Sequence, residues 1–178
     1  MTYDPVACLL HWLMAVLLIV MFLFGMQMEE LTLAERREAL PMHASMGLLL
    51  LLLAGFRALW RRRHLPPPYP DSMSQSQQKW AKGLVHAFYL LMILVPIVGL
   101  LHAASYMDFE IHAFGVWNLT ALLPSGKTFT GVFHVLHGTC AWLLIILVIG
   151  HVGATLKHAF MDKDEIPARM LPVLKRPR

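Results

Sequence analysis

The sequence predicts an all-α integral membrane protein, a single four-helix bundle over residues 1–178 with both termini in the cytoplasm. Of the 178 residues, 57% are hydrophobic and 15% are charged, a composition far more apolar than that of an ordinary soluble domain. Four apolar stretches are long enough to cross a bilayer as helices. The charges between these stretches are divided unevenly, as expected for loops on opposite sides of a membrane.

The predicted spans occupy about residues 6–28, 42–60, 84–105 and 132–156. The first span resembles a signal peptide in hydropathy. However, the residues before it include Asp4 and no Lys or Arg, and no small-residue cleavage site follows it. We therefore expect a helix that is retained in the mature protein. Three prolines at 66–68 predict a stiff linker after the second span, continued by a Ser/Gln-rich stretch. Pro96 with Gly99 predicts a kink in the third span.

Loop charges predict the orientation. The connection between the second and third spans and the C-terminal tail are rich in basic residues: Arg61, Arg62, Arg63, Lys79, Lys82, Lys157, Lys163, Arg169, Lys175, Arg176 and Arg178. The first connection is acidic and the third holds little positive charge, so both are expected outside. The net charge of +4 therefore reflects topology, and we expect no nucleic-acid binding.

Four histidines are expected at two depths of the membrane. His137 and His151 are 14 residues apart on the fourth span, about four helical turns, so their imidazoles share one face about 21 Å apart along the axis. His43 lies at the outer start of the second span and His11 near the cytoplasmic start of the first. Because an imidazole in hydrocarbon is costly without a partner, these residues are functional candidates.

A haem iron held between two histidines satisfies both imidazoles. We pair His43 with His137 in an outer site and His11 with His151 in an inner site, an arrangement characteristic of b-type electron-transfer haems. The sequence contains no Cys-x-x-Cys-His motif, so two non-covalent haem b groups are predicted. A zinc or copper site would instead need three or four ligands at one depth. Single histidines near helix ends, such as His102, are commonly interfacial residues.

Spacing places two further residues near the predicted haems. Gly47 follows His43 by one turn, where the missing side chain would let a porphyrin approach the backbone, although close helix packing also explains a glycine there. Arg57 follows His43 by 14 residues and reaches the inner level. There its guanidinium would bind a haem propionate or, alternatively, extend to the cytoplasmic membrane surface.

The chain resembles the bacterial cytochrome b561 family, four-helix di-haem membrane cytochromes that include the superoxide oxidases. The matching motifs span almost the whole length: Leu10-His11-Trp12, His43 with Gly47 and Arg57, Pro96 with Gly99, then His137, His151, His158, Lys163-Asp164 and Arg169-Met170-Leu171-Pro172. The sequence departs from the family in two places. Gly138 follows His137 where the family often has Glu, and His86 precedes Tyr89 by three residues instead of the usual four.

The resemblance implies a multi-pass protein of the bacterial inner membrane that carries electrons between a quinone and a periplasmic redox partner. In the superoxide oxidases, superoxide reduces ubiquinone, so a superoxide:ubiquinone oxidoreductase is the first hypothesis. His158 matches a position where it would hydrogen-bond a quinone carbonyl near the inner haem. For the superoxide anion, Lys127 and the titratable His134 and His112 would supply positive potential outside, opposed by Asp108 and Glu110.

An electron-transfer subunit without substrate chemistry of its own is the alternative, as in the cytochrome b subunits of hydrogenases and formate dehydrogenases. Such a subunit docks another redox protein. The short loops favour the enzyme, since little protein would project from the bilayer to form a docking surface. A non-redox structural or transport bundle is the third possibility.

Overall fold

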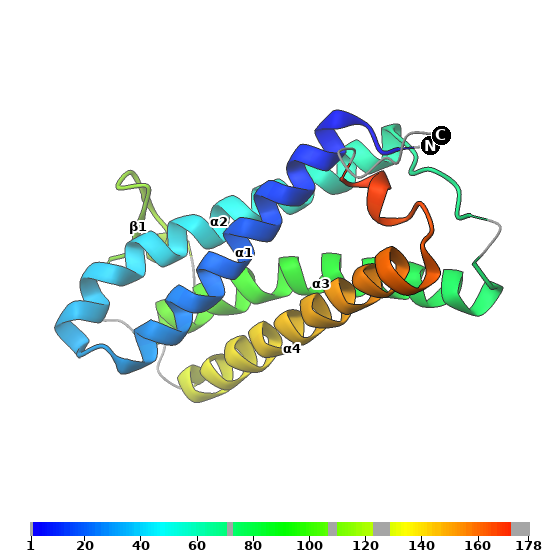
Figure 1. Ribbon diagram of the computed structural model, residues 1–178. Helices are drawn as coiled ribbons and strands as arrows, with labels where there is room; N and C mark the ends of the chain where they lie inside the picture. The colour runs from blue at the N-terminus through cyan, green and yellow to red at the C-terminus, as the bar shows by residue number, and fades with distance from the viewer. Residues whose placement is uncertain (1, 71–72, 107–109, 123–128, 172–178) are drawn as a thin grey trace.

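The structure, a computed structural model, contains four long helices within its described residues, which confirms the predicted fold class (Figure 1). It describes residues 2–70, 73–106, 110–122 and 129–171. The four helices are α1 (Pro5–Glu30), α2 (Leu33–Arg63), α3 (Gln75–Tyr106) and α4 (Thr130–Lys157). Each is long and apolar enough to cross a membrane.

Two helices begin earlier than the apolar runs predict. α2 starts at Leu33 instead of about residue 42, because Thr32 and Glu35 form a capping box in which each side chain accepts the other's backbone N–H. α3 starts at Gln75, within the stretch expected to be linker, where Ser74 and Gln77 form the same pair of contacts. The acidic first connection is therefore mostly helical, and hydropathy marked only the apolar part of each helix.

Asp4 caps the N-terminus of α1. Its carboxylate accepts hydrogen bonds from the Ala7 N–H and from the indole N–H of Trp60 on α2, both at 3.0 Å, and Pro5 occupies the first helical position, which suits proline. Burial alone would raise the pKa of Asp4, but these hydrogen bonds outweigh it, so the pKa lies below its ordinary value. The Asp4 side chain thus links the N-terminus of α1 to the C-terminal end of α2.

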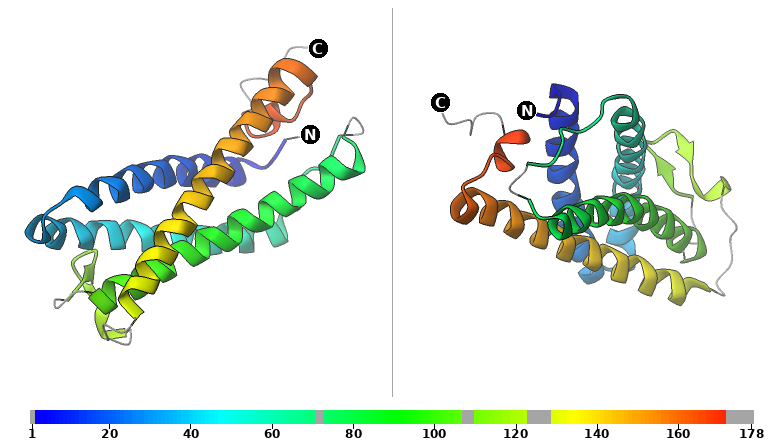
Figure 2. Two further views of the ribbon diagram at one scale, coloured as in Figure 1. Left: turned by 90° about the horizontal axis from the view of Figure 1, so that it is seen from below. Right: turned by 90° about the vertical axis from the view of Figure 1, so that its right-hand side faces the viewer.

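The helices form two antiparallel pairs, α1 with α2 and α3 with α4, and α2 also packs on α3 (Figures 1 and 2). The first residues and the segment after α4 lie at one end of the bundle (Figure 1). There Tyr3 N–H donates to the Arg169 carbonyl at 3.2 Å, and the buried Arg169 side chain pairs with Glu165 and donates to the carbonyl of Pro68. This end is therefore held together by the chain's two ends and the proline linker.

The outer surface of the helices is apolar. Large side chains such as Leu9, Val16, Ile146 and Ile149 are each more than half exposed, whereas the helix contacts bury mainly alanines, leucines and methionines. A soluble protein rarely exposes such a continuous apolar surface. The exposed faces suit lipid, in agreement with four membrane-spanning helices.

The connection between α3 and α4 folds back over α2. It includes the strands β1 (His112–Ala113) and β2 (Trp117–Asn118) and the short helix η1 (Thr120–Leu122). The Ser45 hydroxyl, on α2, donates to the carbonyl of Pro41 at 2.6 Å and accepts the Phe114 N–H at 2.8 Å. Ile111 and Ala113 are buried in the same place, so the described part of this connection packs against the side of α2 (Figure 1).

Candidate functional site

The structure brings together the two histidine pairs that the sequence predicts. The ring centroids of His43 on α2 and His137 on α4 are 6.2 Å apart with planes at 78°. Those of His11 on α1 and His151 on α4 are 6.1 Å apart with planes at 77°. Each pair joins two helices that are distant in the sequence, and α4 contributes to both.

These separations suit one metal ion between the two imidazoles of each pair. A metal–imidazole bond is about 2.0 Å long and the bonding nitrogen lies about 1.2 Å from the ring centre, so two axial imidazoles have centroids about 6.4 Å apart. Rings in direct contact could lie closer together than this. Both pairs therefore have the spacing of a bis-histidine haem site.

A cavity of about 240 Å³ surrounds the outer pair. All four helices line it, and His43 and His137 both reach it. His137 Nδ1 lies 2.9 Å from the Val95 carbonyl, which can only accept a hydrogen bond, so Nδ1 carries the proton and Nε2 has a free lone pair. His43 Nδ1 is buried without a hydrogen-bond partner among the described residues. The polar atoms of this cavity thus fit a ligand bound between the rings.

Two glycines make room for these rings. A Cβ atom at Gly99 would lie 2.7 Å from Cε1 of His137, and one at Gly25 would lie 3.4 Å from Cε1 of His43. The first distance is shorter than real Cβ contacts allow. Gly47, which the sequence places near a porphyrin, lines the cavity, but a Cβ there would meet only Pro96 at an ordinary 3.9 Å. Gly99 is therefore the glycine that the His137 position requires.

The inner pair lies beside an aromatic ring and an arginine. The Phe88 ring contacts His151 edge-on at 5.7 Å, and the positive charge of Arg57 acts on both His11 and His151. Arg57 donates to the Ala7 carbonyl at a long 3.5 Å. It also lines a small cavity with Tyr89, whose hydroxyl is buried without a partner among the described residues. Arg57 thus lies at the inner level, where a propionate would find unsatisfied donors.

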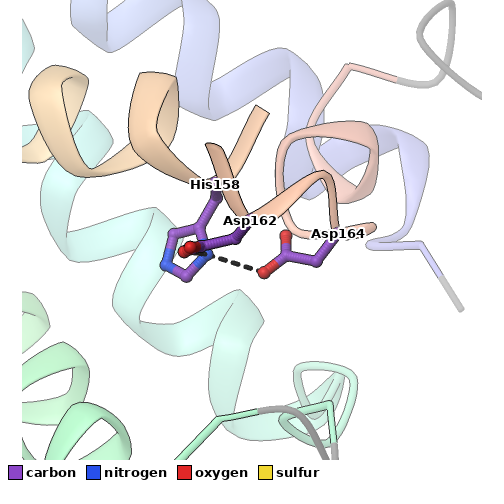
Figure 3. A group of neighbouring side chains, drawn as sticks. All are labelled: His158, Asp162 and Asp164. Carbon is purple, nitrogen blue, oxygen red and sulfur yellow. Dashed lines mark hydrogen bonds and ion pairs between the residues drawn. The ribbon is translucent and has the colours of Figure 1, made fainter. Parts of the chain in front are cut away.

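His158 belongs to a polar cluster just beyond α4, in a π-helical turn over His158–Asp162 (η3) (Figure 3). Its Nδ1 lies 2.7 Å from Asp164 Oδ2 and 3.2 Å from Asp162 Oδ2. Lys157 neutralises Asp162 through an ion pair of 2.6 Å, so Asp164 is the carboxylate that orients the imidazole. The ligand atoms of His158, Asp162 and Asp164 lie within 4.8 Å of one another.

The remaining predicted residues lie mostly at the end opposite the termini. His134 is exposed, and its ring centroid is 5.1 Å from that of His102. His112 pairs with Glu110 at 3.0 Å. Lys127 and Asp108 lie outside the described residues. His86 is exposed and bonds its own helix through the Lys82 carbonyl at 2.8 Å, so it belongs to neither histidine pair.

Sequence reasoning missed two residues of the outer cavity. His102, interpreted as interfacial, lines the cavity, because it follows Gly99 by three residues and so shares its helix face. Arg36, assigned to a loop, also lines the cavity, since α2 begins before it. The spacing of Arg36 to His43, seven residues or two helical turns, could have revealed it.

Comparison with known proteins agrees with these features. Residues 2–173 match the family model described as prokaryotic cytochrome b561. The chain is 32% identical over 171 residues to cytochrome b561 homolog 2 of Escherichia coli K12, covering 95% of this chain and 90% of that protein. It is also 27% identical over 182 residues to cytochrome b562 of Cereibacter sphaeroides, covering 99% and 96%. Cytochrome b561 homolog 1 of E. coli is 24% identical over 131 residues, 73% of each chain.

Proposed function

This chain belongs to the prokaryotic cytochrome b561 family, and on that premise we propose that it passes electrons across the inner membrane through two haem b groups. Membership makes it a membrane protein that uses haem b for electron transfer. The finer proposal is that superoxide on the periplasmic side is the electron donor and ubiquinone on the cytoplasmic side the acceptor. This is the activity of a superoxide:ubiquinone oxidoreductase.

The single observation that carries the proposal is the pair of histidine separations, 6.2 Å and 6.1 Å. His137 and His151 provide one ligand each from α4, and His43 and His11 provide the opposing ligands. Their positions on α4 would place the two haem sites about 21 Å apart along the helix axis. Haem, when bound, supplies one-electron oxidation and reduction at each level, which suits a path that crosses the bilayer.

The chain's own residues hold and orient the groups at the outer level. The Val95 carbonyl fixes the tautomer of His137 and leaves Nε2 to face the iron. Gly99 and Gly25 leave space for the two rings. His43 and His137 would hold the haem between them, and a haem held by two histidines would supply electron transfer without an open position for oxygen.

At the inner end, His158 is placed to hydrogen-bond a quinone carbonyl through Nε2, since Asp164 holds its Nδ1. Two superoxide ions each lose one electron and become O2. One ubiquinone gains these two electrons and two protons and becomes ubiquinol, so electrons and charge balance. His158 is the residue proposed to donate a proton to the reduced quinone oxygen, with Asp164 stabilising the charged imidazolium.

The proposed orientation puts both termini in the cytoplasm. Basic residues end α2, including Arg61 and Arg63, at the same end of the bundle as the chain's first residues. The opposite end carries Glu35 and Glu38 in the first turns of α2. This distribution follows the positive-inside rule.

One feature favours the alternative, an electron-transfer subunit that docks another redox protein. The hairpin of β1 and β2 exposes Phe114, Val116 and Trp117, of which Val116 is 73% exposed, at the end proposed to face the periplasm. Apolar side chains displayed together on a folded loop suit a protein interface. The docking function and the enzyme make different predictions for purified protein.

Stopped-flow mixing of superoxide with the oxidised, detergent-purified protein tests the proposal. The enzyme predicts haem reduction within milliseconds, followed by ubiquinol formation when ubiquinone is present. Superoxide dismutase added before mixing should abolish both signals. If the haems are reduced by dithionite but not by superoxide, the proposed enzyme activity is wrong and the result favours the docking function.

A further inference from the structure

Arg36 is the positively charged residue of the outer cavity's lining, and the proposed electron path leaves it unused. It lies on α2 seven residues before His43, which places it about 10.5 Å further along the helix on nearly the same face. Its side chain lines the cavity that contains His43 and His137. Arg36 therefore stands between the outer histidine pair and the polar end of the bundle.

The guanidinium of Arg36 is only partly satisfied. Its Nη2 donates to the Glu29 carbonyl at 3.3 Å, and its Nε is buried without a partner among the described residues. A buried N–H without an acceptor is costly, more so in a charged group. A guanidinium has five donors in a fixed plane, and its preferred partner is a carboxylate bound by two of them. The cavity thus offers an anion site at Arg36.

Other charges at the mouth define what this site can hold. Arg36 and Glu29 both act electrostatically on His102 in the cavity wall, and the His134 ring lies next to that of His102. Glu29 is the acidic residue of the lining, and its carboxylate opposes a bound anion. Among the described residues that line the cavity, Arg36 carries the positive charge and Glu29 the negative charge, so a negatively charged group binds best at Arg36.

We propose that Arg36 binds a propionate carboxylate of the outer haem. The inference rests on the proposed haem between His43 and His137. Haem b carries two propionates on one edge, and a bound haem would direct this edge towards the polar end of the bundle, because a carboxylate is costly in hydrocarbon. Arg36 lies in that direction from the iron axis, and its free Nε supplies the donor that a bidentate contact needs.

The charge of Arg36 has a predictable effect on the outer haem. A nearby positive charge favours the ferrous form, which carries one positive charge fewer than the ferric form. Removing the guanidinium also leaves a propionate uncompensated, and a negative charge favours the ferric form. Both effects lower the midpoint potential of the outer haem. The midpoint potential of the inner haem should change little, because the inner site is far from Arg36.

Redox titration of detergent-purified variants tests the inference without superoxide or quinone. His137→Ala first identifies the spectral signal of the outer haem by its loss. In Arg36→Gln, the reduced-to-oxidised ratio of that signal at a fixed potential should fall at least tenfold, or about 59 mV for one electron. Arg36→Lys keeps the charge and should recover most of the loss, and Arg37→Gln, on the exposed neighbouring position, is the matched control.

Loss of the outer haem from Arg36→Gln, with retention in Arg36→Lys, would equally support propionate binding, because the charge then anchors the group. An Arg36→Gln protein with the potentials and haem content of Arg37→Gln would overturn the inference and leave the proposed electron path intact. Equal effects of Gln and Lys at Arg36 would also overturn it. An unsubstituted protein without an outer haem would refute both proposals.

Discussion

Gly99→Ala is expected to remove the outer haem while leaving the helices folded. The added Cβ would lie 2.7 Å from Cε1 and 2.8 Å from Nδ1 of His137, about 1 Å closer than carbon atoms pack at their optimum. The ring cannot simply rotate away, because Nδ1 is held by the Val95 carbonyl on the same helix as Gly99. Overpacking of this kind costs about 1–3 kcal/mol.

Gly99→Ala should weaken haem binding more than it lowers the stability of the fold. A shift of the His137 ring by about 1 Å is half the length of a metal–imidazole bond, so Nε2 would leave its axial position. Gly25→Ala, with a 3.4 Å contact to His43, should weaken haem binding less. Gly55→Ala is the control, because it is exposed on α2 and a Cβ there meets nothing within 4 Å.

The assay is a pyridine haemochrome measurement of haem per purified chain, with the helix content followed by circular dichroism. Gly55→Ala should bind as much haem per chain as the unsubstituted protein. Gly25→Ala should bind less, and Gly99→Ala should bind the least, with one haem lost. Full retention of both haems in Gly99→Ala, with an unchanged spectrum, would refute the placement of His137 as an outer ligand.

Three further variants test other parts of the account. His137→Ala should remove the outer haem and keep the inner one; loss of both from a folded protein would contradict the pairing. His158→Ala should keep both haems and slow ubiquinol formation, and unchanged quinone kinetics would exclude a quinone role. Asp4→Ala should cost about 1 kcal/mol of stability near neutral pH, since Asp4 caps α1 and accepts from Trp60; thermal melting measures it.

The Asp4 effect has a defined pH dependence. Its pKa is lowered in the folded protein, so its contribution is present above the ordinary carboxyl pKa and is lost as the pH falls through the folded value. The stability difference between Asp4→Ala and the unsubstituted protein should therefore shrink at acid pH. A difference independent of pH would show that the charge of Asp4 contributes nothing.

Hydropathy and histidine depth were sufficient to predict the fold class and the two levels at which the histidines lie. A helix in a bilayer converts sequence position into depth almost linearly. Depth groups His43 with His137 on the outer level, and His11 with His86 and His151 on the inner level. In the structure the ring centroids of His43 and His137 are 6.2 Å apart and those of His11 and His151 are 6.1 Å apart, whereas His86 bonds its own helix.

Features built from polar segments were harder to predict. The helical extensions before the second and third spans have no apolar run, although Thr32 with Glu35 and Ser74 with Gln77 are capping boxes that a closer examination of the sequence would have identified. Missing the first extension hid Arg36. The contact of His158 with Asp164 depends on a π-helical turn and a left-handed Lys163, and no local pattern predicts these conformations.

The central claim is that the four paired histidines hold two haems at two depths. A reduced-minus-oxidised spectrum with quantified haem and protein tests it most directly, repeated on His137→Ala and on His11→Ala. The account predicts two haem b groups per chain, and one in each variant, with a different spectral component lost in each case. One haem or none in the unsubstituted protein, or the same component lost in both variants, would contradict it.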